Sequence, residues 1–195
     1  LLDSEIQTFN IKNKKYFSII LIIFTIFITL KYHYRFNETR KFHELERIDL
    51  EKSVPASKID KSLNGLQWIT PLFKDEPSRE ILILQQTKNR IEEIQHEIMF
   101  VTNYLFLDSI TKKKLNYPSR TFTLDGTIIP IRGNRFYDNY KKFLINKIKK
   151  NNIEEIYFLK HERISTRIVK DYIDENCYSL NEDKLFYIFK INCLE

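Results

Sequence analysis

An uncharged apolar run near the start of the chain constrains its fold most. Residues 16–30 read YFSIILIIFTIFITL, in which eleven of fifteen positions are Ile, Leu or Phe. As a helix these residues cover only ~22 Å, but extension to Tyr34 gives ~28 Å, close to the ~30 Å hydrocarbon layer of a bilayer. The run has no polar stripe and therefore predicts a transmembrane helix over residues 16–34.

Two other interpretations of this run stay open. A secretory signal would also place Lys12, Lys14 and Lys15 before an apolar run, although residues 29–32 lack the small side chains of a cleavage site. A buried core helix would be expected to show one polar face.

The side of the membrane on which the rest of the chain lies depends on the residues near the run. More basic residues follow it than precede it, which favours a cytoplasmic domain, but that rule applies to short loops only. The chain opens Leu1, Leu2, Asp3 and not with Met, which favours a fragment. Residues 1–15 are expected to be a short polar loop, and if Leu1 and Leu2 end an earlier helix, residues 3–15 with their three Lys are cytoplasmic. We then expect the large domain outside.

The remaining sequence divides into a connector and a folded domain. Residues 35–62 are dense in charge and predict a linker or stalk. Residues 63–195 carry the apolar patterns of a globular domain, in a chain that is 43% hydrophobic and 14% aromatic. Such a composition excludes a disordered chain, and 133 residues suffice for one core.

Helical and strand patterns alternate through this domain. Alternation of this kind predicts an α/β fold, specifically a Rossmann-like three-layer domain with a mostly parallel sheet. The expected helices are 76–96, 104–115, 136–150 and 166–176, and the expected strands are 98–103, 121–124, 128–131, 153–159 and 185–191.

One loop resembles a catalytic motif. Thr123 to Thr127 resembles the Asp-x-Asp-Gly-Thr loop of haloacid-dehalogenase-type phosphatases, with Asp125 in the place of the acid. The nucleophilic carboxylate is replaced by Thr123, a hydroxyl with no adjacent base. We therefore expect a turn between two strands, and a membrane-anchored phosphatase is the weakest alternative.

The sequence predicts no metal and no cofactor. The four histidines are scattered, without the spacing of paired metal ligands, and no glycine-rich phosphate loop follows a strand. The histidines are His33, His43, His96 and His161.

A basic helix is expected at residues 136–150. Its lysines predict a solvated face, with attraction to anionic lipid headgroups as the alternative. Its aromatic residues are expected on the opposite, core-facing stripe, which argues against a nucleic-acid partner. The lysines are Lys141, Lys142, Lys147, Lys149 and Lys150, and the aromatics are Phe136, Tyr140 and Phe143.

Four residues are candidates for a site or a cross-link. Arg120 and Arg132 lie in expected loops near strand ends and could bind an anion bidentately, although ordinary loop structure would also explain them. Cys177 and Cys193 are the only cysteines. In an extracytoplasmic domain they could form a disulfide that stabilises by about 3 kcal/mol, and two buried thiols are the alternative.

Several short segments carry a resemblance. In chain order these segments are Asn37, Arg40 to Phe42, Leu45, Gly65, Leu66, Trp68 to Pro71, Thr102 to Tyr104 and Ile153 to Phe158. In this order they resemble the C-terminal end of multi-pass bacterial GT-C-type glycosyltransferases that use polyprenyl-phosphate sugars. In that family a last transmembrane helix precedes a soluble extracytoplasmic α/β domain. The metal- or acceptor-associated carboxylates of the family lie in its first extracytoplasmic loop. Nothing in this sequence matches that loop, so no catalytic residue carries over.

We therefore expect a non-catalytic extracytoplasmic domain of a glycosyltransferase-like protein in a bacterial inner membrane. Its expected partners are the lipid bilayer and upstream transmembrane helices of the same protein, and not nucleic acid. The competing hypothesis is a single-pass membrane-anchored binding or scaffold domain without enzymatic activity.

Overall fold

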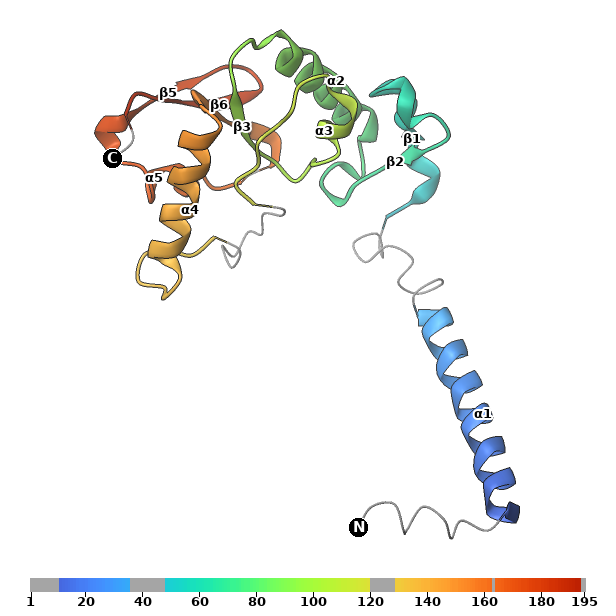
Figure 1. Cartoon of the computed structure of the whole chain (residues 1–195). Coiled ribbons are helices and arrows are strands. Elements are labelled where there is room, and N and C mark those ends of the chain that lie inside the picture. Colours follow the sequence, from blue (N-terminus) through green and yellow to red (C-terminus); the bar gives the residue numbers. More distant parts are fainter. Residues whose placement is uncertain (1–10, 36–47, 120–128, 163, 194–195) are drawn as a thin grey trace. The chain divides into compact units, whose positions relative to one another are not determined.

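The computed structural model describes residues 11–35, 48–119, 129–162 and 164–193. The chain forms two compact units (Figure 1): Leu1–Lys52 with Ile69–Lys74, and Ser53–Trp68 with Asp75–Glu195. The second unit, called the domain below, thus includes residues 53–62, which the sequence assigned to the linker.

Helix α1 (Ile11–His33) contains the apolar run. The 18 residues from Tyr16 to His33 have a mean hydropathy of 1.7, and none of them is buried. Thr25 donates its hydroxyl hydrogen to the backbone oxygen of Leu21 at 2.8 Å, so this polar group is satisfied within the helix. In the described part of the chain, α1 is the one helix long and apolar enough to cross a membrane. A buried core helix is not what the structure has.

The domain contains a mixed four-stranded sheet with strand order β3-β4-β6-β5. The pair β3·β4 is parallel, whereas β4·β6 and β5·β6 are antiparallel. A second, antiparallel sheet pairs β1 with β2. The strands are β1 (Val54–Pro55), β2 (Gln67–Trp68), β3 (Ile98–Val101), β4 (Glu155–Leu159), β5 (Tyr178–Glu182) and β6 (Phe186–Ile191).

The α/β character agrees with the sequence analysis, but the mostly parallel, Rossmann-like sheet is wrong. Only Asp183, Lys184 and Leu185 separate β5 from β6. So short a connection can form only an antiparallel hairpin, because a parallel crossover needs about a dozen residues. The Asp183 carboxylate accepts hydrogen bonds from the backbone N–H groups of Leu185 and Phe186, both at 2.7 Å, and fixes the turn.

Two of the four helices expected in the domain are present near their predicted bounds, although α2 ends three residues early. α2 and α4 confirm the helices predicted from residues 76 and 136, whereas the other two shrink to four residues each. Residues 121–128 lie outside the described part of the chain, and residues 129–131 form no strand. The helices are α2 (Pro77–Glu93), α3 (Leu107–Ile110), α4 (Tyr137–Lys150) and α5 (Arg167–Lys170), with 3-10 turns η3 (Leu50–Lys52), η4 (Ala56–Lys58), η5 (Lys61–Leu63), η6 (Pro71–Phe73), η7 (Lys160–Glu162) and η8 (Glu175–Cys177).

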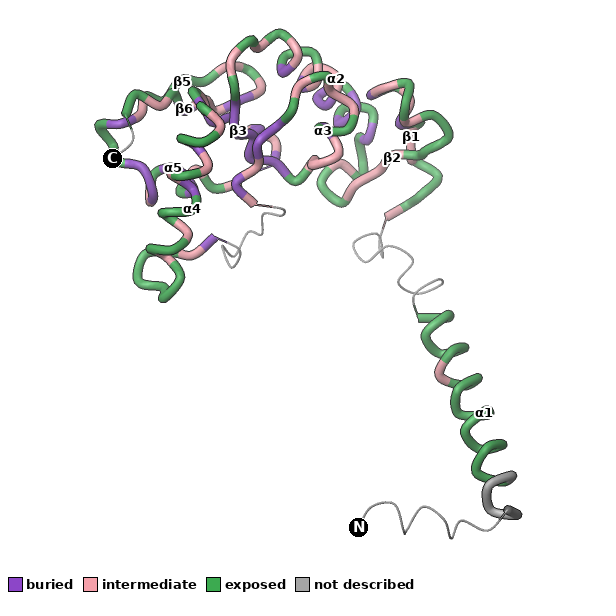
Figure 2. The backbone as a smooth tube through the Cα atoms, viewed as in Figure 1, coloured by how far each residue is buried: buried purple, intermediate pink, exposed green. Residues whose placement is uncertain are grey.

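The parallel strands β3 and β4 are covered on both faces. All four residues of β3 are buried (Figure 2). The last four residues of β4 are buried as well, as expected for strands with a layer on each side. One face packs against α4 and α5 through Met99, Phe158, Leu144 and Val169. β5 is the exposed edge of the sheet.

Candidate functional site

The carboxyl ends of the parallel strands β3 and β4 bring polar residues together. Val101 pairs with Phe158, so Thr102 and η7 follow the two strands at the same edge of the sheet. Ligand sites of open α/β sheets lie at this edge. Thr102 is 0% exposed and Glu162, the last residue of η7, is 9% exposed.

Glu162 is held by the segment that follows β3. The backbone N–H of Asn103 donates to its Oε1 at 2.6 Å, and the Thr102 hydroxyl donates to its Oε2. The backbone N–H of Tyr104 in turn donates to Thr102 Oγ1 at 3.0 Å.

A second buried carboxylate lies in the first turn of α2. Glu80 is fully buried and accepts two hydrogen bonds, from Tyr104 Oη to Oε1 at 2.6 Å and from Trp68 Nε1 to Oε2 at 2.9 Å. Trp68 also packs against Phe106, with ring centroids 5.1 Å apart. We call Trp68, Glu80, Thr102, Tyr104 and Glu162 the strand-end cluster.

Burial dominates the electrostatics of this cluster. It raises the pKa of Glu162 to about 7, against the hydrogen bonds from Thr102 and Asn103, while the charge of Glu80 adds to the increase. Burial and the nearby Arg79 charge lower the pKa of His161.

The strand-end cluster has the geometry of a buried hydrogen-bond network that links secondary-structure elements, and not that of an exposed catalytic site. Thr102 and Glu162 are within hydrogen-bond reach, as a nucleophile and its base would be. However, the Thr102 side chain is wholly buried, and each of the four oxygens of Glu80 and Glu162 already accepts a hydrogen bond from the protein. The cluster therefore joins α2 to the ends of β3 and β4.

Sequence reasoning did not single out Glu80 or Glu162. Glu80 stands in the buried stripe of α2 beside Ile81 and Leu84, where an apolar residue is expected. This polar residue at a core position was the one sequence feature that could have indicated a buried polar network.

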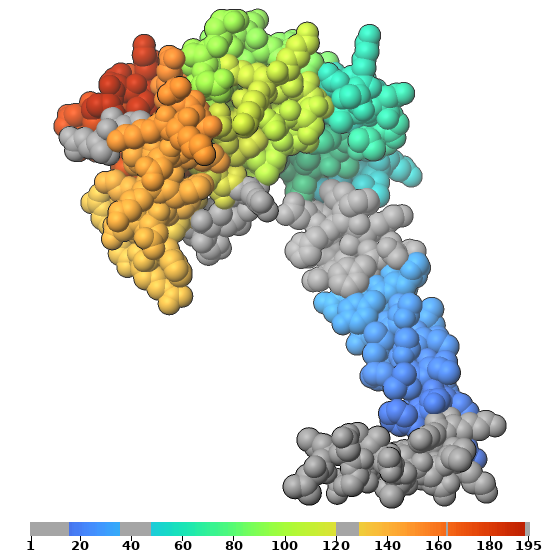
Figure 3. Space-filling model, in the orientation of Figure 1, coloured from blue at the N-terminus to red at the C-terminus, as the bar shows by residue number. Residues whose placement is uncertain are grey.

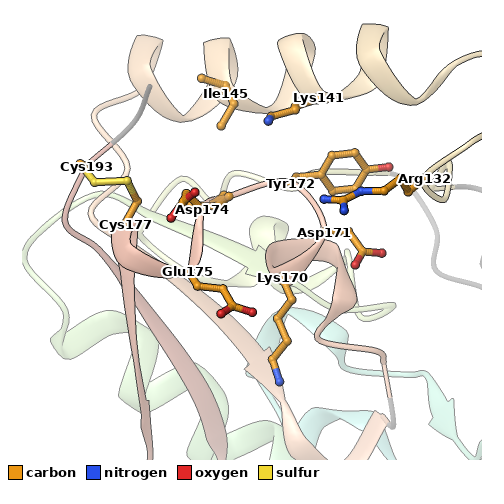
Figure 4. A pocket seen from close by; sticks show the side chains of 11 residues that line it. Arg132, Lys141, Ile145, Lys170, Asp171, Tyr172, Asp174, Glu175, Cys177 and Cys193 are labelled. Atoms are coloured by element: carbon orange, nitrogen blue, oxygen red, sulfur yellow. A yellow bond between two sulfur atoms is a disulfide. The ribbon is translucent and has the colours of Figure 1, made fainter.

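Arg132, predicted to bind anions, lines a pocket between α4 and the segment 170–177. The cavity measures about 320 Å³. Figure 4 shows Arg132 beside the ring of Tyr172 and below Lys141 of α4. Arg120, its predicted partner, lies outside the described residues, as does Asp125.

The charges that line this cavity, called the arginine pocket, balance one another. Three cations and three carboxylates face it, so a bare anion would meet repulsion as well as attraction. The arrangement suits a polar ligand bearing both charges or many hydroxyls. The charged residues are Arg132, Lys141, Lys170, Asp171, Asp174 and Glu175.

A disulfide between Cys177 and Cys193 forms one wall of the arginine pocket. The two Cα atoms are 4.6 Å apart, and the backbone N–H of Asn192 donates to the Cys177 carbonyl at 2.8 Å. Of the two alternatives left open by the sequence, the structure contains the disulfide.

No group of three or more His, Cys, Asp or Glu residues in the described part of the chain could hold a metal ion. His96 lies instead 2.9 Å from Glu155, measured from Nε2 to Oε2. His43 falls outside the described residues.

Comparisons with protein-family models, with characterised proteins and with solved structures find no match for this chain. The resemblance to glycosyltransferases therefore depends only on the residues quoted in the sequence analysis.

Proposed function

We propose that this chain is the membrane-anchored, extracytoplasmic, non-catalytic domain of a polyprenyl-phosphate-sugar-dependent glycosyltransferase-like protein in a bacterial inner membrane. The observation that carries the proposal is the Cys177–Cys193 disulfide, in a chain whose α1 is apolar enough to span a membrane. Disulfides persist in the periplasm and are rare in the cytoplasm. This favours a domain on the outer side.

The state of the buried carboxylates supports a role without chemistry. A general acid or base must reach its substrate, but Glu80 and Glu162 are buried and bonded to protein donors. Charged side chains make up most of the polar lining of the arginine pocket. Among its described residues the Tyr172 phenol is the one hydroxyl, and there is no imidazole. Binding is the activity that this arrangement favours.

The resemblance supplies the transferase context. Trp68, Thr102 and Tyr104 belong to the segments that carry it, and all three are members of the strand-end cluster. We infer that the quoted segments are needed to fold this domain, whereas catalysis belongs to a membrane part of the same protein. The lipid bilayer and further transmembrane helices are then its partners.

A single-pass membrane-anchored binding domain is the second candidate. The arginine pocket favours it, because such a pocket needs no membrane core to bind a small polar ligand.

Sugar transfer by membranes of the native organism separates the two candidates. Membranes containing the native gene product are supplied with radiolabelled polyprenyl-phosphate sugar, and compared with membranes whose gene product ends after residue 52. We expect transfer to fall when the domain is removed, and the purified 195-residue chain to transfer no sugar.

Two results would contradict the transferase proposal. One is unchanged transfer after removal of the domain at equal protein level by immunoblot. The other is sugar transfer by the purified chain alone.

A further inference from the structure

A second cavity lies between the C-terminal half of α4 and the segment 114–119. Its volume is about 470 Å³, and Lys114, Asn116, Tyr117, Phe143, Lys147 and Asn151 are among its lining residues. In the space-filling view the segment containing α4, coloured yellow to orange, forms part of the visible surface (Figure 3). We call this cavity the lysine pocket. It shares no lining residue with the arginine pocket.

The lysine pocket differs from the arginine pocket in its charge. Lys114 and Lys147 line it, and no carboxylate does among the residues that the structure describes. The Lys147 ammonium donates to the backbone oxygen of Tyr117, which is a neutral partner. Burial, and then the charge of Lys114, lower the pKa of Lys147, so the two cations are close enough to repel. An anion between them would relieve that repulsion.

Three neutral polar side chains of the pocket are engaged by the protein. The Asn116 amide donates to the Ile98 carbonyl at 3.1 Å, and the Asn151 amide donates to the Lys147 carbonyl at 2.8 Å. The Tyr117 hydroxyl donates to the Leu105 carbonyl at 3.3 Å. These bonds fix the walls, so the ammonium groups are the main recognition elements for a ligand.

An aromatic face completes the pocket. The sequence predicts Phe143 on the core-facing stripe of its helix, but this residue is 50% exposed. Lys147 Nζ lies 5.7 Å from its centroid. A ligand with an apolar C–H face can therefore pack on the ring while its charged group meets the cations.

We propose that the lysine pocket binds a phosphate monoester carried on a small hydroxylated body, the class of phosphorylated sugars. A phosphate presents several acceptor oxygens to two ammonium donors, and a sugar ring has the C–H face that Phe143 can contact. This inference is independent of the transferase proposal, since any membrane-anchored domain with this pocket would have the same chemistry.

Calorimetric titration of the full chain in a polyoxyethylene detergent tests the proposal. The probes are glucose 6-phosphate, inorganic phosphate and glucose. We expect saturable binding of glucose 6-phosphate, weaker binding of phosphate and none of glucose. Lys147→Gln and Lys114→Gln should each weaken binding by roughly ten- to a hundredfold, the usual effect of losing a charge-assisted hydrogen bond.

Two further variants are matched controls. Lys142→Gln removes the same charge from the same helix, away from the cavity, and should change affinity by less than about twofold. Lys147→Arg keeps the charge and should retain most of the binding. Trp68 fluorescence checks the fold of each variant, and the exposed Lys114 supplies the test if Lys147→Gln does not fold.

A lipid phosphate could supply the same group, so a second measurement distinguishes the sources. The chain is placed in nanodiscs of phosphatidylcholine with or without phosphatidic acid, whose headgroup is a phosphate monoester, and glucose 6-phosphate is titrated again. Competition by phosphatidic acid that Lys114→Gln abolishes would assign the site to the phosphate monoester of a lipid headgroup, which still supports a phosphate-monoester site. Absence of saturable binding by every phosphate probe, equal binding of glucose, or equal losses in Lys142→Gln would overturn the proposal.

Discussion

Two buried glutamates, Glu80 and Glu162, accept hydrogen bonds from several protein donors. The charge of Glu80 acts on Glu162. Each carboxylate accepts hydrogen bonds from donors in the segment 102–104. Removing one partner of such a network leaves unsatisfied buried groups, which costs about 1–3 kcal/mol for each neutral group. The cluster is therefore a place where stability should respond to pH.

Glu162→Gln should flatten the pH dependence of stability. The pKa of Glu162 is raised from 4.5 to about 7, so the native state holds a proton that the unfolded chain releases. Glu162 therefore makes its full contribution to the free energy of unfolding below about pH 4.5. That contribution, up to about 3 kcal/mol, is lost as pH rises through 7. Gln resembles the protonated acid. Thermal unfolding between pH 5 and 8 should therefore show a smaller loss with rising pH in the variant.

A matched change in the same cluster serves as the control. Thr102→Val keeps the carboxyl group and removes one hydrogen bond that lowers its pKa. The pH dependence should persist in this variant. A Glu162→Gln variant that loses stability with rising pH as steeply as the parent would show that another group titrates.

These residues could not have been found as a site from the sequence. The bond between Thr102 and Glu162 joins residues 60 positions apart, and that between Tyr104 and Glu80 joins residues 24 apart. No local spacing encodes such pairs. Arg132 was recognisable as a loop arginine, yet its neighbours Lys141 and Lys170 come from two separate helices.

At the scale of elements, the sequence predicted those with strong apolar patterns. α2, α4, β3, β4 and β6 all lie where their periodicity placed them. β5 was missed because four of its five residues are exposed, so it shows no buried alternation. A helix was expected over 166–176, but α5 ends at Lys170. Because the prediction lacked β5 and made this helix too long, it gave a mostly parallel sheet in place of the antiparallel hairpin.

The disulfide fastens the exposed hairpin at its base. Cys177 precedes β5 and Cys193 follows β6, so the bond encloses both strands. Because β5 buries little surface, packing contributes little to holding this edge strand in the sheet. The disulfide stabilises its position covalently.

Cys177→Ser combined with Cys193→Ser should lower the free energy of unfolding by about 3 kcal/mol, from the entropy of a loop of 16 residues. Denaturant unfolding in detergent measures this, followed by the fluorescence of Trp68, the chain's single tryptophan. Reductant should shift the parent protein equally and leave the double variant unchanged. Two titratable thiols in the unfolded, unreduced parent would rule out the bond.

At the scale of the whole molecule, an apolar helix and a disulfide-bonded domain make different demands on their surroundings. α1 exposes large apolar side chains, such as Phe24 at 61% and Phe27 at 63%, which water would not favour. Ten or more Ile, Leu and Phe residues at roughly 0.4 kcal/mol each favour insertion by about 4 kcal/mol. The domain, by contrast, has its own core and an oxidised cysteine pair.

Labelling of a new cysteine in intact bacterial spheroplasts tests this division most directly. Asn146→Cys places one thiol on the exposed side of α4, while the native cysteines stay bonded. We predict that the protein sediments with membranes after alkaline carbonate extraction. A membrane-impermeant maleimide should label Asn146→Cys before lysis and leave the parent unlabelled. Protein recovered in the soluble fraction, or labelling that requires lysis, would contradict a membrane-anchored domain on the outer side.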